Sequence, residues 1–161
     1  LIQNNNINST IHAGEAYGPE SIHQAIHYCS ANRIGHGTRL YEDTDLMNYV
    51  NDHRIAMEIC LSSNIHIGSV KSLNDHPFKM YFDENIRVTL NTDNRHISNT
   101  TLTDEYLLAA DTFKLNLEDI FTIIINGFKS AFLPHNERRA MINSVASELA
   151  SASNPEKSIA I

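Results

Sequence analysis

Short apolar runs alternate along the chain with longer segments in which apolar residues recur at helical spacing. Four runs rich in Ile, Val, Leu or Thr predict β-strands at 8–12, 33–36, 55–60 and 87–91. Helical spacing, or a proline near a first turn, predicts helices at 19–32, 43–52, 77–84, 103–114, 117–126 and 134–150. The polar stretch 61–75, which follows the third strand, is expected to be a loop. The chain is therefore expected to alternate strands with helices.

This alternation favours a parallel sheet, because parallel neighbours need long crossover connections, and the expected fold class is α/β. Polar residues follow the strands on their carboxyl side: His12 and Glu15, then His36, then Ser62, Ser63 and Asn64, then Asp93 and Asn94. A (β/α)8 barrel and an open doubly wound sheet both place ligands at that edge, so position alone leaves both open. Four units would make half a barrel. The sequence has no GxGxxG or GxxxxGK phosphate loop, which weakens the nucleotide-binding alternative.

Composition excludes some classes of function. With 161 residues, 42% of them hydrophobic, the chain can form one domain with a real core. A formal net charge of −7 counts against charge-driven binding to nucleic acid or anionic membranes. No apolar run approaches the roughly 18 residues of a membrane span, and no targeting signal is recognised. Cys29 and Cys60 are far apart and form no CxxC pair, which favours a reducing, cytoplasmic setting.

The residues at the strand ends suggest metal chemistry. Neutral imidazole and carboxylate are common zinc ligands, which makes His12, His36 and Asp93 candidates. Glu15 follows Gly14, where a tight turn could bring its carboxyl over a substrate as a general acid or base. Taken singly, a histidine at a strand end is more often a hydrogen-bonded structural residue, and NTD is also an ordinary helix-capping turn. Their joint placement favours a metal-dependent hydrolase.

Three segments in order, IHAGEA, RIGHGT and LNTDN, resemble the signature segments of the adenosine deaminases. The similarity extends to EICLSSN, HPF and NGFKSAFLP and so runs through nearly the whole chain. This family is a zinc-dependent branch of the amidohydrolase superfamily on a (β/α)8 TIM barrel. The resemblance therefore implies that the chain forms strands 5 to 8 of that barrel with their helices.

The resemblance also implies a role for each matching residue. His12, on the fifth barrel strand, and Asp93, at the end of the eighth, would bind Zn²⁺. Glu15 would donate a proton to purine N1, and His36 would orient and help deprotonate the metal-activated water. The implied reaction is hydrolysis of adenosine or 2'-deoxyadenosine to inosine or deoxyinosine plus ammonia, in purine salvage.

The chain departs from the family pattern in two respects that matter for the site. Asn94 replaces an aspartate that contacts purine N7, and its amide can donate a hydrogen bond without being protonated. The HxH pair that supplies two further zinc ligands on the family's first strand has no counterpart before His12. We therefore expect 1–161 to be the C-terminal half of a single barrel domain, with a polar and mobile tail at 152–161. Such a chain would be inactive alone and would need the missing N-terminal half or a second copy.

Two other functions stay open. A sister deaminase acting on adenine or a modified adenosine would share these residues, because most groups that recognise the ribose would lie outside this chain. A non-catalytic fragment or binding module would keep the fold and lack zinc. Metal analysis and a substrate panel discriminate between these alternatives.

Overall fold

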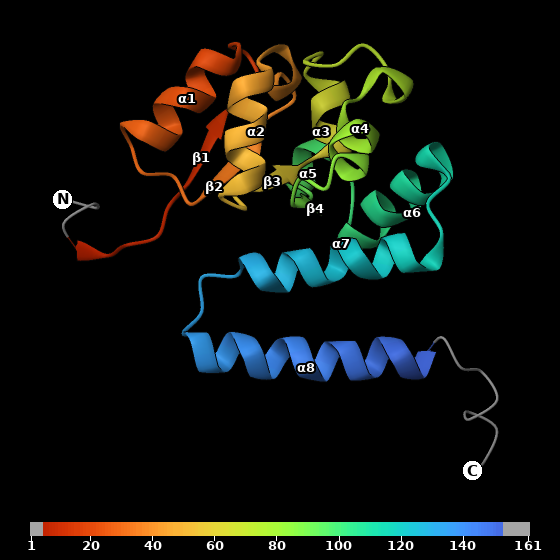
Figure 1. Cartoon of the computed structure of the whole chain (residues 1–161). Helices are drawn as coiled ribbons and strands as arrows, with labels where there is room; N and C mark the ends of the chain where they lie inside the picture. The colour runs from red at the N-terminus through yellow and green to blue at the C-terminus, as the bar shows by residue number, and fades with distance from the viewer. Residues whose placement is uncertain (1–4, 153–161) are drawn as a thin grey trace.

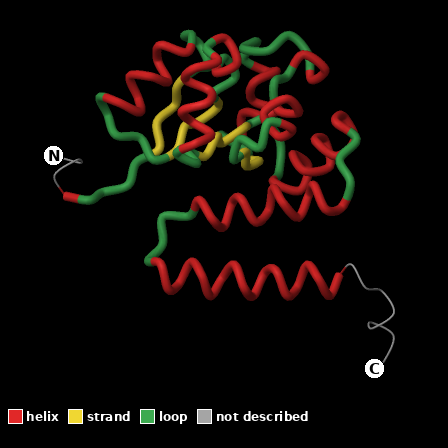
Figure 2. The backbone as a smooth tube through the Cα atoms, in the orientation of Figure 1, coloured by secondary structure: helices red, strands yellow, loops and turns green. Residues whose placement is uncertain are grey.

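The computed structural model describes residues 5–152, so residues 153–161, which make up most of the expected tail, lie outside the described residues. Within the described range the strands are β1 (Thr10–Ala13), β2 (Arg33–His36), β3 (Ala56–Ile59) and β4 (Val88–Leu90). Adjacent strands are parallel, and their order in the sheet is their order in the sequence. The expected strands, the parallel sheet and the α/β class are confirmed. Figure 2 shows the strands with the helices around them.

Helices connect and follow the strands (Figure 1). They are α1 (Pro19–His27), α2 (Thr44–Asp52), α3 (Leu61–His66), α4 (Phe78–Asp83), α5 (Arg95–Ser98), α6 (Leu102–Phe113), α7 (Leu117–Ser130) and α8 (His135–Ala152), with short 3-10 turns η2 (Leu40–Glu42) and η3 (Leu73–Asp75). The six predicted helices are all present with shifted ends. The first ends at His27 rather than at 32, and α8 extends to Ala152, so the expected tail is helical at its first residue.

The expected loop at 61–75 is wrong in its first part, because α3 occupies 61–66. The sequence LSSNIH is too short to show a helical apolar repeat, and serine and asparagine are poor helix formers. The helix instead depends on tertiary contacts. Leu61 is fully buried, and the Ser62 amide donates to the buried Glu105 carboxylate of α6 at 3.3 Å.

The two faces of the sheet differ in character. Strand register aligns Ile11, Ile34, Met57 and Val88 in one apolar row on the face covered by helices. The apolar core lies between this face and helices α1, α2 and α4, which contribute buried side chains to it. Burial of this row supplies the main driving force for folding.

The opposite face of the sheet carries polar residues. The next row in register runs from His12 through Gly35 to Glu58 and Thr89. Glu58 accepts a hydrogen bond from the Thr10 hydroxyl and forms a salt bridge with Arg33 at 3.0 Å, so this face has a polar network of its own. His12, in this polar row, lies near the carboxyl end of β1, the end at which barrel enzymes carry their sites.

The last helices lie beside the end of the sheet. Helix α7 packs on β4, and its buried Asn126 side chain donates to the Val88 carbonyl at 3.3 Å. Helix α8 runs alongside α7 (Figure 1) and has no buried residue. β1 and β4 each pair with one neighbour. None of the helices in 5–152 has the length and apolar character needed to cross a membrane.

Candidate active site

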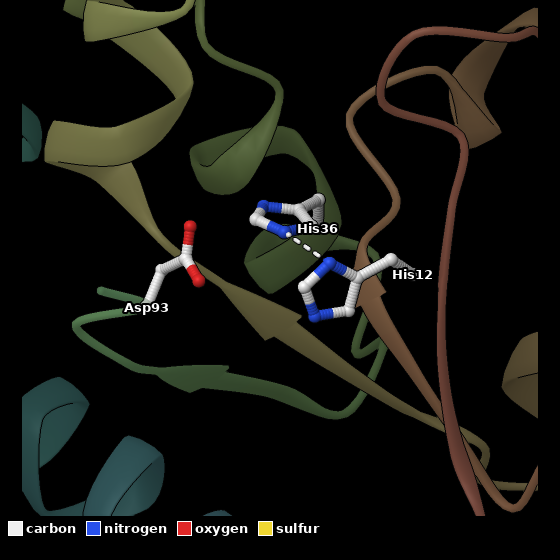
Figure 3. Close-up of side chains that lie close together, drawn as sticks. All are labelled: His12, His36 and Asp93. Atoms are coloured by element: carbon white, nitrogen blue, oxygen red, sulfur yellow. Dashed lines mark hydrogen bonds between the residues drawn. The ribbon is translucent and has the colours of Figure 1, made fainter.

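Three side chains from different strand ends converge at the carboxyl edge of the sheet. His12 lies on β1, His36 ends β2 and Asp93 follows β4. One potential ligand atom of each lies within 4.8 Å of the others, and Figure 3 shows the three side chains facing a common space. His36 Nε2 lies 3.2 Å from His12 Nδ1, with the two rings nearly perpendicular at 82°. The structure therefore brings together residues that are 81 positions apart in the sequence, from 12 to 93.

The backbone is unusual at two of these three residues. His36 has φ 67° and Asp93 has φ 53°, both in the left-handed region that side chains other than glycine rarely adopt. Such conformations cost of order 1 kcal/mol and cluster at functional sites. His36 is the last residue of β2 and Asp93 lies three positions after β4, and both side chains belong to the cluster.

Two glycines make room for the site. Gly35 is the register partner of His12, and a Cβ there would meet His12 Cδ2 at 2.6 Å, so only glycine lets the ring lie against β2. Gly14 has φ 67° and forms the turn that the sequence predicts before Glu15. Together they position the imidazole of His12 and the carboxyl of Glu15 on the same side of the strand end.

The donor set fits a divalent transition metal. Two imidazoles and one carboxylate are ligands that suit zinc, and they also occur with iron and copper. The Asp93 carboxylate is held in place by the buried Ser63 hydroxyl of α3, which donates to Oδ2 at 2.8 Å. Hydrogen bonds of this kind orient metal-binding carboxylates. Ser63 is thus a supporting residue of the candidate metal site.

Glu15 and His36 form the second part of the site. Glu15 Oε1 lies 3.1 Å from His36 Nδ1 and accepts a hydrogen bond from Asn64 Nδ2 at 3.3 Å. Burial raises the pKa of Glu15, with the charge of Asp93 adding to this effect and His12 opposing it. Burial also lowers the pKa of His36, and His12 lowers it further. Both shifts favour the neutral form, so we treat the contact as a hydrogen-bonding pair rather than an ion pair.

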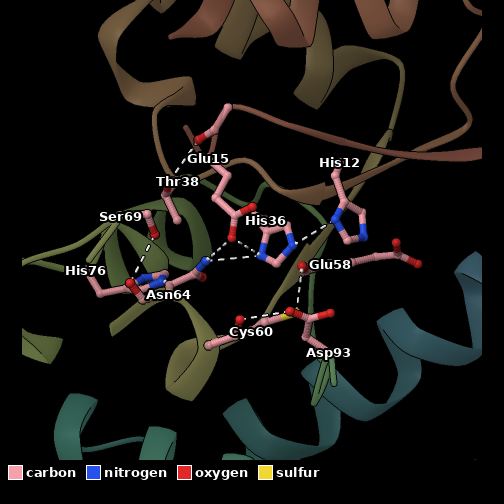
Figure 4. A network of polar contacts seen from close by, with 12 residues as sticks. His12, Glu15, His36, Thr38, Glu58, Cys60, Asn64, Ser69, His76 and Asp93 are labelled. Carbon is pink, nitrogen blue, oxygen red and sulfur yellow. Dashed lines mark hydrogen bonds and ion pairs between the residues drawn. The ribbon is translucent and has the colours of Figure 1, made fainter. Parts of the chain in front are cut away.

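A buried chain of hydrogen bonds fixes the orientation of the Asn64 amide (Figure 4). The Phe78 amide donates to His76 Nδ1 at 3.1 Å, so the proton of neutral His76 is on Nε2. That nitrogen lies 3.2 Å from Asn64 Oδ1 and donates to it. Asn64 Nδ2 therefore faces the site, where it contacts His36 Nδ1 at 3.0 Å as well as Glu15. Burial lowers the pKa of His76 to about 4, which keeps this ring neutral.

Asn94 lies next to Asp93 at the rim and begins α5. Its Oδ1 accepts from the His96 and Ile97 amides at 3.2 and 3.1 Å, so it caps this helix. Within the described part of the chain its Nδ2 makes no hydrogen bond, and it stays available as a donor. The capping explanation and the expected donor role are thus compatible, because they use different atoms.

The sequence alone did not identify His76 as a member of the site. The motif segment HPF, which contains it, was the only signal, and it does not show what the side chain contacts. Ser63 and Asn64 were noted only as polar residues after a strand. Their roles depend on α3 and on the turn before α4.

Comparisons with known proteins agree with this geometry. A family model described as adenosine deaminase matches residues 2–148. An adenosine deaminase of Mycobacteroides abscessus is 43% identical over 155 residues, which cover 89% of this chain and 43% of that protein. The chain thus spans less than half the length of this curated relative.

Solved structures show the same fold. The adenine deaminase of Arthrobacter aurescens matches with a TM-score of 0.86 at 22% identity, over 92% of this chain and 45% of that chain. The Arabidopsis N6-mAMP deaminase matches with a TM-score of 0.79 at 27% identity, over 90% and 42%. An amidohydrolase from Burkholderia ambifaria with bound zinc matches with a TM-score of 0.77 at 16% identity, over 92% and 44%. The chain therefore corresponds to part of a barrel in these enzymes.

Proposed function

Since the chain belongs to the adenosine deaminase family, we propose that it forms part of a zinc-dependent enzyme that hydrolyses adenosine or 2'-deoxyadenosine. The products are inosine or deoxyinosine and ammonia. The observation that carries this proposal is the convergence of His12, His36 and Asp93 within 4.8 Å, with Glu15 in contact with His36.

In this proposal His12 and Asp93 hold the metal, and the rest of the protein supplies further ligands. Bound zinc would supply a water whose pKa is lowered to roughly 7, ready to act as a nucleophile. The imidazole of His12 and the carboxylate of Asp93 are ligand types that suit zinc, and a zinc-bound structure among the fold neighbours supports this choice of metal. Ser63 keeps the Asp93 carboxylate oriented for this task.

Residues of this chain donate protons and hydrogen bonds to the substrate and orient the attacking water. A raised pKa makes Glu15 a carboxylic acid over a wider pH range, which suits it to protonate purine N1. His36, which is buried, orients the attacking water in this proposal. Asn94 Nδ2 donates to purine N7, which is an acceptor. Asn64 and His76 are positioning residues, because Asn64 contacts Glu15 and His36, and His76 orients Asn64.

The experiment that tests this function is a substrate panel on the whole protein that contains these 161 residues. Adenosine, 2'-deoxyadenosine, adenine and N6-methyl-AMP are supplied in turn. The release of ammonia is measured for the first three substrates, and the release of methylamine for N6-methyl-AMP. We expect the two nucleosides to be the best substrates. The second candidate function is that of a sister deaminase, because two of the fold neighbours are an adenine deaminase and an N6-mAMP deaminase. A preference for adenine or N6-methyl-AMP would favour this second candidate over the proposal.

The chain also has an expected partner. Since β1 and β4 each pair on one side, four more strands would close the barrel. We propose that the N-terminal part of the protein supplies them, with a second copy as the alternative, and that the chain alone is inactive. The remaining alternative function is that of a non-catalytic binding module without zinc. Deamination by the isolated chain at the rate of the whole protein would contradict the expected dependence on a partner.

A further inference from the structure

Five basic side chains line one cavity of about 190 Å³ at the amino-terminal ends of the strands. They are Arg33, Arg54, Arg87, Lys129 and Arg138. Parallel strands place this cavity at the edge opposite the candidate active site. The chain as a whole carries a formal net charge of −7, so a basic composition does not explain the concentration.

Within residues 5–152, only one of these five cations is in a salt bridge. Arg33 is paired with Glu58 at 3.0 Å and stacks over the Phe132 ring. In the described part of the chain, the other four cations form no salt bridge. Two of the four make hydrogen bonds to neutral groups: Arg54 donates to the Asn85 carbonyl at 2.7 Å, and Arg138 to the Ala131 carbonyl at 3.3 Å. These bonds hold the two side chains in place without neutralising them.

Arg87 is the most constrained member of the group. Its Nε is buried, and within residues 5–152 it has no hydrogen-bond partner. Burial lowers the pKa of Arg87, and the nearby charges of Arg54 and Arg138 lower it further. Like charges gathered around a buried donor without a partner are unfavourable unless an anion joins them.

We propose that this cavity binds a phosphate group. Guanidinium groups donate paired hydrogen bonds that match the oxygens of phosphate, and several of them around one cavity can satisfy a multiply charged anion. A water molecule occupies about 30 Å³ in the liquid, so the cavity has room for a tetrahedral oxyanion. The phosphate is either free inorganic phosphate or the phosphomonoester end of a small metabolite. This site is separate from the deamination chemistry, and it does not depend on the metal.

Binding is tested by calorimetric titration of the whole protein with inorganic phosphate at constant ionic strength. We expect saturable binding with a Kd of about 1 mM or tighter. Ribose 5-phosphate in a parallel titration distinguishes the two sources, because a phosphomonoester that binds more tightly is the better ligand. Phosphate is also expected to raise the melting temperature, because it binds the folded state.

Two variants and a matched control make the test specific. Arg138→Gln and Arg54→Gln should each weaken phosphate binding about tenfold, since each removes a charged donor. Arg139→Gln removes the same charge from an exposed position that does not line the cavity and should leave the Kd unchanged. Circular dichroism confirms that each variant is folded. Absence of saturable binding, or an equal loss in Arg139→Gln, would overturn the proposal.

Discussion

His76 Nε2 lies 3.2 Å from Asn64 Oδ1, and this contact fixes which end of the Asn64 amide faces the candidate active site. Both side chains are buried, with exposed fractions of 4% and 0%, so water does not compete for the bond. The result is a single donor, Nδ2, directed at both Glu15 and His36. A residue outside the ligand cluster thus orients the donor that contacts Glu15, the proposed proton donor, and His36.

Asn64→Asp tests this control of orientation. The substituted carboxylate cannot donate, and it brings a negative charge beside Glu15. We expect kcat of the whole protein to fall roughly 100-fold with KM little changed and zinc retained. The matched control is Asn74→Asp, which makes the same change at an exposed position. Equal kcat values for the two variants would contradict the positioning role.

Glu15→Gln tests the proton donor. The amide keeps the size of the side chain but has no carboxylic proton, so we expect kcat to fall by about 10² to 10⁴ while zinc stays bound. The rate is measured from the loss of adenine absorbance. Glu20→Gln, an exposed change on α1, should keep the normal rate. A nearly unchanged rate in Glu15→Gln would exclude this carboxyl as the acid.

His76 should give stability a measurable pH dependence. Its pKa is lowered to about 4 in the folded protein, so the unfolded chain binds this proton more readily below an ordinary pKa of about 6.5. The contribution to the free energy of unfolding is therefore fully present above pH 6.5. It is lost as the pH falls towards 4, by up to about 3 kcal/mol.

Urea denaturation at several pH values measures this effect. We expect His76→Gln to show a shallower loss of stability between pH 6.5 and 4 than the unsubstituted protein. His66→Gln, at an exposed histidine, should retain the steeper loss. Parallel curves for all three proteins would show that His76 is not held neutral by burial.

Glu105 supports the segment that carries Ser63 and Asn64. It is fully buried, and its two oxygens accept from the Ser62 amide at 3.3 Å and the Thr100 hydroxyl at 3.0 Å. Glu105→Ala should lower the free energy of unfolding by about 2–4 kcal/mol, because it leaves buried donors without partners. Denaturant curves compare it with Glu118→Ala, an exposed change on α7. Equal stability of the two variants would contradict this role.

The strands and most helices could be predicted because their signals are local. Ile34 and Met57 belong to short apolar runs, and Pro19 marks the start of α1. The amphipathic pattern of α7, with Asn116 as its cap, also made that helix predictable. Helix α3 was not predicted, because it depends on contacts with α6 rather than on a pattern in its own six residues.

The candidate site was predictable in its residue types but not in its detailed arrangement. The spacing of His12, His36 and Asp93 after strands indicated a shared edge, since parallel strands end together. The positive φ of His36 and Asp93 has no sequence signal comparable to a glycine. The role of His76 depends on a bond to a residue 12 positions away, which no local pattern contains.

Metal analysis of the purified whole protein tests whether His12 and Asp93 hold a catalytic zinc. We predict one tightly bound zinc per protein. His12→Ala should lose both zinc and deaminase activity, whereas His96→Ala, at an exposed histidine of α5, should keep both. A protein that deaminates adenosine with no bound metal, or a His12→Ala variant that keeps its zinc and its full rate, would contradict the claim.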